Sequence, residues 1–286
     1  FDDDNVAFVG DALFALGWLA GLPWRISLVA ALGLALSSTA IALQVLAERN
    51  LMRTSSGRAG FSILLFQDVA AISILALLPL LGAAAGAGDE HSAGEVLLEA
   101  LKILGGRLLL RPLLRWIAKS RTPEIFTAAS LLLVVSIAYL MVMVGLSMAL
   151  GAFLAGVLLA DSEYRSELEA DIEPFKGLLL GLFFIAVGMS IDFGVLMRSP
   201  WLMAGILLGF LALKAVVIYT LAKVAGVPYQ ERPVFTLLLA QGGEFAFVVF
   251  QAAAGAQVFS AETASLLIGA VALSMLISPL LLVLID

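Results

Sequence analysis

Long apolar runs recur along this 286-residue chain, and most are close to the length of a membrane-spanning helix. A helix needs about 20 mostly apolar residues to cross the hydrocarbon core of a bilayer. The runs therefore predict about ten transmembrane helices, separated by short clusters of Gly, Pro and charged residues. The predicted spans are 6–22, 26–47, 59–81, 96–116, 124–144, 147–160, 175–191, 201–224, 233–254 and 264–285.

The composition indicates the same fold class, an all-α polytopic membrane protein. Hydrophobic residues make up 62% of the chain and charged residues 13%, whereas soluble domains average about 45–50% and about 25%. These values exclude a disordered chain, a nucleic-acid-binding domain and an ordinary soluble enzyme. The chain has no cysteine, and it carries no G-x-S-x-G, H-E-x-x-H or phosphate-binding motif. We therefore predict neither an enzyme nor a bound cofactor.

Basic residues gather on alternate connections between the predicted spans. One side of the membrane receives only Arg25 and Arg198, whereas the other receives four basic clusters. The clusters lie within 49–58, 111–121, 165–176 and 223–232. Because basic connections mark the cytoplasmic side, we expect both chain ends to be cytoplasmic. The same asymmetry supports a crossing by the weakly apolar run 96–116.

The connection 161–174 is strongly acidic and falls on the predicted cytoplasmic side. Its acidic residues are Asp161, Glu163, Glu167, Glu169, Asp171 and Glu173. A charge run of this kind is most often a solvated linker helix. The alternative interpretation is a regulatory contact surface.

Asp68 is an acidic residue in the middle of an apolar run. It follows the start of its predicted span by about nine residues, which is roughly 14 Å at 1.5 Å per residue. A charge at the bilayer centre costs at least ~2.5–3.5 kcal/mol, so such residues usually mark an ion or proton pathway. The alternative is a structural carboxylate that is hydrogen-bonded to a neighbouring helix.

Two predicted spans are interrupted by polar and small residues at their centres. The first contains Ser37, Ser38 and Thr39, and the second contains the sequence QGGE at 241–244. Glycine and hydroxyl side chains weaken a helix, and unwound backbone at this depth is tolerated where it is buried or lines a cavity. Broken helices in matching places of two halves are typical of a transporter site near the midplane. The alternative is that these residues only pack helices together.

Lys214 is the third ionisable residue near mid-depth, after Asp68 and Glu244. One cation and two acids on three helices would compensate one another's charge. The alternative is that the lysine ammonium reaches the membrane surface along its flexible stem. An acid in such a cluster can take up a proton or a cation in turn.

Several sequence motifs resemble those of the Kef family of glutathione-regulated potassium-efflux antiporters. The motifs are LSSTAIA at 36–42, ERNL at 48–51, LFQDVAAI at 65–72, LGAFLAGVLLA at 150–160, SEYR at 162–165, DIEPFKG at 171–177, FFIAVGMSIDF at 183–193 and GEFAFVVF at 243–250. The likeness covers most of the chain from about residue 27 onward.

The resemblance implies a monovalent cation:proton antiporter domain with an inverted repeat and two broken, crossing helices. The implied ion- and proton-binding residues are Asp68, Gln67, Thr39, Ser38, Glu244, Gln241 and Lys214. It also implies a regulatory loop that includes Glu163, Arg165, Glu169, Asp171, Glu173 and Lys176, in which Ser166 replaces an expected histidine. The implied partners are the bilayer of the bacterial inner membrane, a second copy of the chain, and a cytoplasmic regulatory domain or ancillary subunit.

We expect residues 1–286 to be the membrane domain of a longer protein. Helices before Phe1 and a nucleotide-binding regulatory domain after Asp286 would belong to that protein, with glutathione conjugates and nucleotide as its regulators. The predicted function is exchange of K⁺ or Na⁺, with K⁺ favoured, for protons that compete for Asp68. The alternatives are a gated potassium channel, although no T-V-G-Y-G filter is present, and a non-transporting membrane sensor or assembly subunit.

Overall fold

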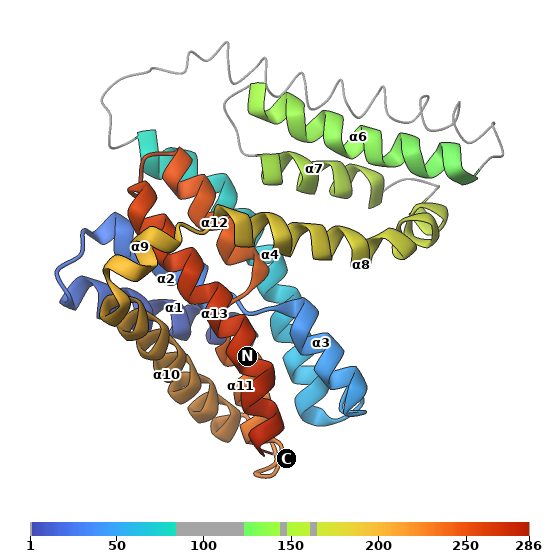
Figure 1. Ribbon diagram of the computed structural model, residues 1–286. Helices are drawn as coiled ribbons and strands as arrows, with labels where there is room; N and C mark the ends of the chain where they lie inside the picture. The colour runs from blue at the N-terminus through green and yellow to red at the C-terminus, as the bar shows by residue number, and fades with distance from the viewer. Residues whose placement is uncertain (1, 84–122, 144–147, 161–164, 286) are drawn as a thin grey trace. The chain divides into compact units, whose positions relative to one another are not determined.

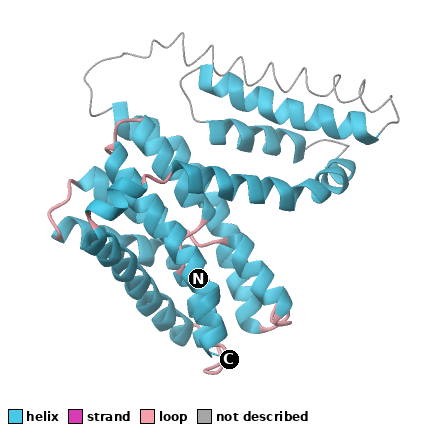
Figure 2. Cartoon of the chain, viewed as in Figure 1, coloured by secondary structure: helices cyan, strands magenta, loops and turns pink. Residues whose placement is uncertain are grey.

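The computed structural model describes residues 2–83, 123–143, 148–160 and 165–285, and every regular element among them is an α-helix (Figure 2). The sequence-based prediction of an all-α protein is confirmed for these residues. The helices, labelled as in Figure 1, are α1 (Asp2–Leu19), α2 (Trp24–Ala35), α3 (Thr39–Glu48), α4 (Ser55–Ala83), α6 (Pro123–Met143), α7 (Met148–Ala160), α8 (Arg165–Ser190), α9 (Phe193–Arg198), α10 (Pro200–Val224), α11 (Arg232–Ala240), α12 (Glu244–Gly255) and α13 (Ala261–Ile285).

The chain divides into two compact units. The first consists of Phe1–Ala85 and Val187–Asp286, and the second of Gly86–Ala186. The first unit holds α1 to α4 and α9 to α13, with the last residues of α8. The second unit holds α6, α7 and the rest of α8, and within it α6 packs against α7.

Six helical stretches among the described residues are long and apolar enough to cross a membrane. They are Trp24–Glu48, Ser55–Leu78, Ile172–Met189, Pro200–Val224, Arg232–Gly255 and Ala261–Leu282. Each overlaps one predicted span. The predicted span 96–116 lies outside the described residues, so the total of about ten spans stays a prediction.

Helix α8 differs from the sequence-based expectation. The acidic segment was predicted to be a connection that ends at Pro174, but α8 runs from Arg165 through Pro174 into the apolar segment. Its first turns contain three glutamates together with Leu168 and Ala170, residue types that favour helix, and Arg165 donates a hydrogen bond to Glu169 one turn later at 2.7 Å. The acidic segment is therefore largely the polar start of an apolar helix rather than a separate linker.

The first unit is built around α12 and α10. Helix α12 packs against α2, α4 and α13, and α10 packs against α11, α13 and α1 (Figure 1). Close approach at the first of these contacts requires glycine, because a Cβ at Gly33 on α2 would overlap the ring of Phe250 on α12. Since lipid tails are as apolar as the protein interior, such tight packing and internal hydrogen bonds hold membrane helices together.

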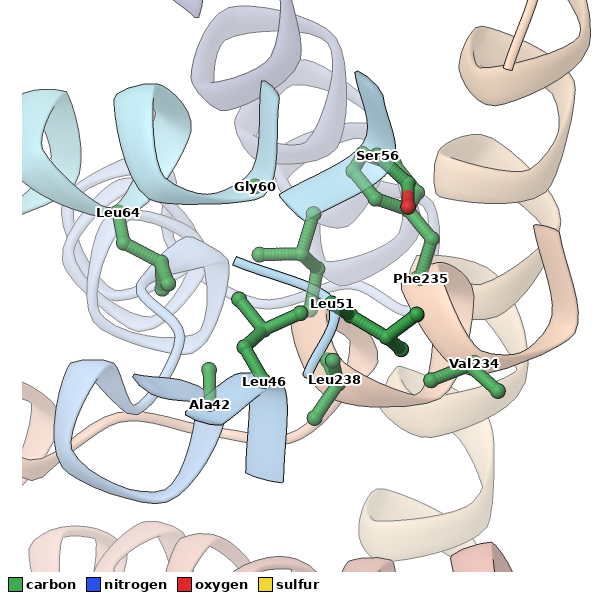
Figure 3. Close-up of a pocket in the computed structure, with 10 residues that line it drawn as sticks. Ala42, Leu46, Leu51, Ser56, Gly60, Leu64, Val234, Phe235 and Leu238 are labelled. Atoms are coloured by element: carbon green, nitrogen blue, oxygen red, sulfur yellow. The ribbon is translucent and has the colours of Figure 1, made fainter. Parts of the chain in front are cut away.

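A small apolar cavity lies between α3, α4 and α11 (Figure 3). Ala42, Leu46, Leu64, Phe235 and Leu238 are among its lining residues. Ser56, also in the lining, donates a hydrogen bond to the carboxylate of Glu231. None of the lining residues carries a carboxylate, and Asp68, Lys214 and Glu244 are not among them. The predicted ion site therefore lies outside this cavity.

Candidate functional site

The first helix break separates α2 from α3. Helix α2 ends at Ala35, Leu36 is extended with φ −67° and ψ 142°, and the side chain of Ser38 caps α3 by accepting a hydrogen bond from the Ile41 N–H. The Ser37 N–H donates to Oε1 of Gln67 at 2.8 Å. Gln67 on α4 is buried, so the unwound backbone finds in it an acceptor that water would otherwise supply.

The second break separates α11 from α12. Helix α11 ends at Ala240, and Gln241 and Gly243 are both extended. The Gln241 side chain donates to Leu238 O at 3.3 Å, and the Gly242 N–H donates to Oγ of Ser274 at 3.0 Å. Each of the two breaks is thus hydrogen-bonded by a side chain of another helix, Gln67 on α4 or Ser274 on α13.

The two breaks lie against each other. The Ser37 hydroxyl donates to Leu239 O at 2.7 Å, and a Cβ built on Gly243 would lie 2.5 Å from Ser37 O. Segments about 200 residues apart thus meet through backbone atoms, with no space for a side chain. This contact explains the glycine at position 243.

Lys214 on α10 joins the two breaks through its ammonium group. The Nζ atom donates to Leu36 O at 3.1 Å, to Ser37 Oγ at 3.2 Å and to Gln241 O at 2.9 Å. The side chain is 0% exposed, so it does not extend to the membrane surface. Leu36 and Gln241 follow the C-terminal ends of α2 and α11, and the negative pole of a helix dipole favours a cation. In the described residues its hydrogen-bonding partners are thus neutral oxygens at helix ends and not the expected carboxylates.

Asp68 lies at the opposite poles of the broken helices. The Thr39 hydroxyl, on the first residue of α3, donates to Oδ1 of Asp68 at 3.0 Å. Glu244, the first residue of α12, is a second acid whose negative charge repels that of Asp68. The N-terminal ends of helices favour negative charge. The two acids therefore lie near the N-terminal ends of α3 and α12, whereas the ammonium of Lys214 lies near the C-terminal ends of α2 and α11.

Glu244 has a carboxylate oxygen that is free to accept a ligand. Its Oε2 atom is buried and has no hydrogen-bond partner among the described residues, and the same holds for Oε1 of Gln241. Carboxylate, amide and hydroxyl oxygens are suitable ligands for a hard cation. Among the described residues, Oε2 of Glu244 and Oε1 of Gln241 are thus the buried acceptor oxygens at the second break that could bind a cation.

The structure brings the predicted ion-site residues to the two breaks. Gln67, Ser38 and Gln241 hold or cap the unwound backbone. Thr39 and Glu244 are the first residues of α3 and α12, and Asp68, in the middle of α4, accepts a hydrogen bond from Thr39. The separate role of Ser37 and the contact from Ser274 had no distinct signal in the sequence. The position of Ser274 inside the apolar run 264–285 was a signal in the sequence. Serines that only pack membrane helices together give the same signal.

The predicted regulatory residues lie mainly on α8. Glu163 lies outside the described residues, and Arg165, Glu169, Asp171, Glu173 and Lys176 belong to the helix. Arg165, Glu169, Glu173 and Lys176 are exposed, as is Ser166. The hydrogen bond from Arg165 to Glu169 raises the pKa of the Arg165 guanidinium. Exposure fits both the solvated and the regulatory interpretation of this segment.

The close contact at Gly243 leads to a prediction. We expect Gly243→Ala to push the two breaks apart and to lower stability by about 1–3 kcal/mol, the usual cost of overpacking. Thermal unfolding in detergent measures this loss. Gly209→Ala is the matched control, because a Cβ at Gly209 on α10 meets no atom within 4 Å. Equal midpoints for the two variants would contradict the backbone contact.

Comparison with known proteins gives the family of this sequence. A family described as "Sodium/hydrogen exchanger, transmembrane" matches residues 5–284. Three similar proteins are each described as "Glutathione-regulated potassium-efflux system protein KefC". The protein from Cronobacter sakazakii is 53% identical over 274 residues, which cover 93% of this chain and 44% of the relative. The protein from Escherichia coli O81 is 52% identical over 290 residues, covering 99% and 46%. The protein from Klebsiella pneumoniae is 53% identical over 273 residues, covering 94% and 44%.

The chain spans less than half the length of these relatives.

Proposed function

Because the chain belongs to the sodium/hydrogen exchanger family, we propose that it is the membrane domain of an antiporter that exchanges potassium for protons. Potassium is the proposed cation because the relatives are potassium-efflux proteins by description. The observation that carries the proposal is the cluster of ionisable residues at the two helix breaks, in which Asp68 accepts a hydrogen bond from Thr39.

The first unit supports an inverted repeat. Helices α1, α2 with α3, and α4 form one set of three, and α10, α11 with α12, and α13 form a second set in the same order. The middle member of each set is broken, and the two breaks meet. We propose that these are the two crossing helices of an inverted-repeat transporter.

Asp68 is the proposed shared site for proton and cation. In one state its carboxylate holds a proton, and in the other it holds a cation with help from Thr39, Ser38 and Gln67 at the first break. Glu244 and Gln241 supply further oxygens at the second break. Competition for one carboxylate couples the two fluxes, because Asp68 binds either a proton or a cation and not both at once.

Lys214 is the proposed fixed countercharge of the site. Its three hydrogen bonds go to oxygens of the breaks, so it neutralises the C-terminal poles of α2 and α11 permanently. The transported cation then binds at the N-terminal ends of α3 and α12, where Asp68 and Glu244 lie. This division of roles explains how one buried ammonium and a cation site coexist at a similar depth.

The proposed setting follows from the charge pattern and the relatives. We propose a bacterial inner-membrane protein with both ends of this segment in the cytoplasm, working as a homodimer. The remainder of the longer protein supplies the regulatory domain. The exposed face of α8, with Arg165, Glu169, Glu173 and Lys176, is its proposed contact.

Ion flux in liposomes tests the proposal. We expect an imposed K⁺ gradient to drive proton movement in the opposite direction, reported by a pH-sensitive dye. We also expect added K⁺ to release protons from the purified protein, because cation and proton compete for one carboxylate. A potassium channel would pass K⁺ without obligatory proton movement, and a sensor subunit would pass neither ion. Either of these results would overturn antiport.

A further inference from the structure

The Ser274 hydroxyl makes one hydrogen bond as a donor and another as an acceptor. The residue lies on α13 and is 0% exposed. Its hydroxyl donates to Val271 O in the same helix at 2.7 Å and accepts from the Gly242 N–H at 3.0 Å. A hydroxyl has one proton and two lone pairs. The bond to Val271 therefore uses the proton and leaves the oxygen to accept from the second break.

The Gln241–Gly242 peptide group is held at both ends. Lys214 donates to its carbonyl oxygen at 2.9 Å, and Ser274 accepts from its N–H. Because a peptide group is planar, two bonds on opposite edges fix the orientation of the whole plane. The next residues are Gly243, which contacts Ser37, and Glu244, which begins α12.

The first break contains the same arrangement. Lys214 donates to the carbonyl oxygen of Leu36 at 3.1 Å, and Gln67 accepts from the Ser37 N–H at 2.8 Å. Leu36 O and Ser37 N belong to one peptide group. Each break thus has one peptide plane between Lys214 and an acceptor side chain of the helix that comes after the broken helix, Gln67 on α4 or Ser274 on α13.

We propose that Ser274 is a positioning residue for ion exchange and the counterpart of Gln67 at the second break. By fixing the Gln241–Gly242 plane, it fixes the start of α12 and so the position of Glu244 relative to Asp68. Ser274 touches no transported ion in this arrangement. The inference rests on the proposed antiport function for its effect on transport, and on hydrogen-bond geometry alone for its effect on the backbone.

Ser274→Ala removes the acceptor and leaves the buried Gly242 N–H without a partner. Loss of one such bond is expected to speed hydrogen–deuterium exchange of the Gly242 amide about tenfold. In the full-length protein in liposomes, we expect the K⁺ concentration for half-maximal proton flux to rise about tenfold as Glu244 shifts. Ser274→Thr keeps a hydroxyl that can bond in the same way and is expected to restore both values.

Ser278→Ala is the matched control. Ser278 lies one turn further along α13, is 3% exposed, and donates only to Ser274 O within its own helix. We expect this variant to keep both the Gly242 exchange rate and the K⁺ dependence within about twofold of wild type, because no break contact is lost.

The two measurements separate the possible failures. Unchanged Gly242 exchange in Ser274→Ala would overturn the positioning role, and so would equal K⁺ dependence in Ser274→Ala and Ser278→Ala. Faster exchange together with a wild-type K⁺ dependence would overturn the link to transport. If the wild-type protein exchanges no ions, the antiport proposal fails together with that link, and amide exchange alone then decides whether Ser274 holds the break.

Discussion

Asp68→Asn is expected to abolish cation-dependent proton flux in liposomes, to more than about 100-fold below wild type. Asparagine has nearly the same shape, and its carbonyl oxygen still accepts from Thr39, so the local fold is kept. Its amide cannot take up a proton near neutral pH, and it has no negative charge to balance a cation. Loss of one partner from a partly buried charge pair is worth several kcal/mol, which corresponds to the expected factor.

Proton release gives a second measurement of the same variant. Wild-type protein is expected to release protons when K⁺ is added, whereas Asp68→Asn is expected to release none. Glu262→Gln is the matched control, since it makes the same acid-to-amide change at an exposed position in the first turn of α13. Exchange at the wild-type rate by inserted, folded Asp68→Asn would show that another group carries the ions.

Lys214→Met is expected to cause the largest loss of stability in the first unit. Methionine keeps a flexible stem of similar length but donates no hydrogen bond. Three oxygens, Leu36 O, Ser37 Oγ and Gln241 O, would lose their shared donor. The Ser37 hydroxyl still donates to Leu239 O, so the two carbonyl oxygens are left without this donor. Each unsatisfied buried polar group costs about 1–3 kcal/mol, so we expect a total loss of about 2 kcal/mol or more.

The unfolding midpoint in detergent measures that loss. Lys223→Met is the control, because Lys223 lies in the last turn of the same helix and is exposed. Its removal weakens only a favourable interaction with the helix dipole, worth about 0.3–1 kcal/mol. A Lys214→Met protein as stable as the Lys223→Met protein would contradict the joining role of the ammonium.

Much of the candidate site was predictable because polar residues are costly in an apolar run. Asp68, Lys214 and the two interruptions stood out for that reason, and the structure brings them into one cluster. Which acid or carbonyl faces Lys214 was not predictable. Neighbours such as Gln67 and Asp68 point about 100° apart on a helix, so one reaches the backbone of the break and the other reaches Thr39.

The fold was less predictable where local and long-range preferences differ. Pro174 indicated the start of a new element, yet α8 continues through it because the preceding residues favour helix. The contact between Ser274 and Gly242 joins residues 32 positions apart. No periodicity in the sequence distinguishes that serine from Ser278, whose hydroxyl donates to Ser274 O within its own helix.

The hydrogen bonds around the two breaks all begin and end within the first compact unit. Lys214, Gln67, Ser274 and Ser37 bind partners that belong to Phe1–Ala85 or Val187–Asp286. A sliding movement of this unit against its surroundings would break none of these bonds. Under the proposed antiport, the groups that hold the two breaks would therefore move together, and a bound ion would keep the same neighbours throughout the movement.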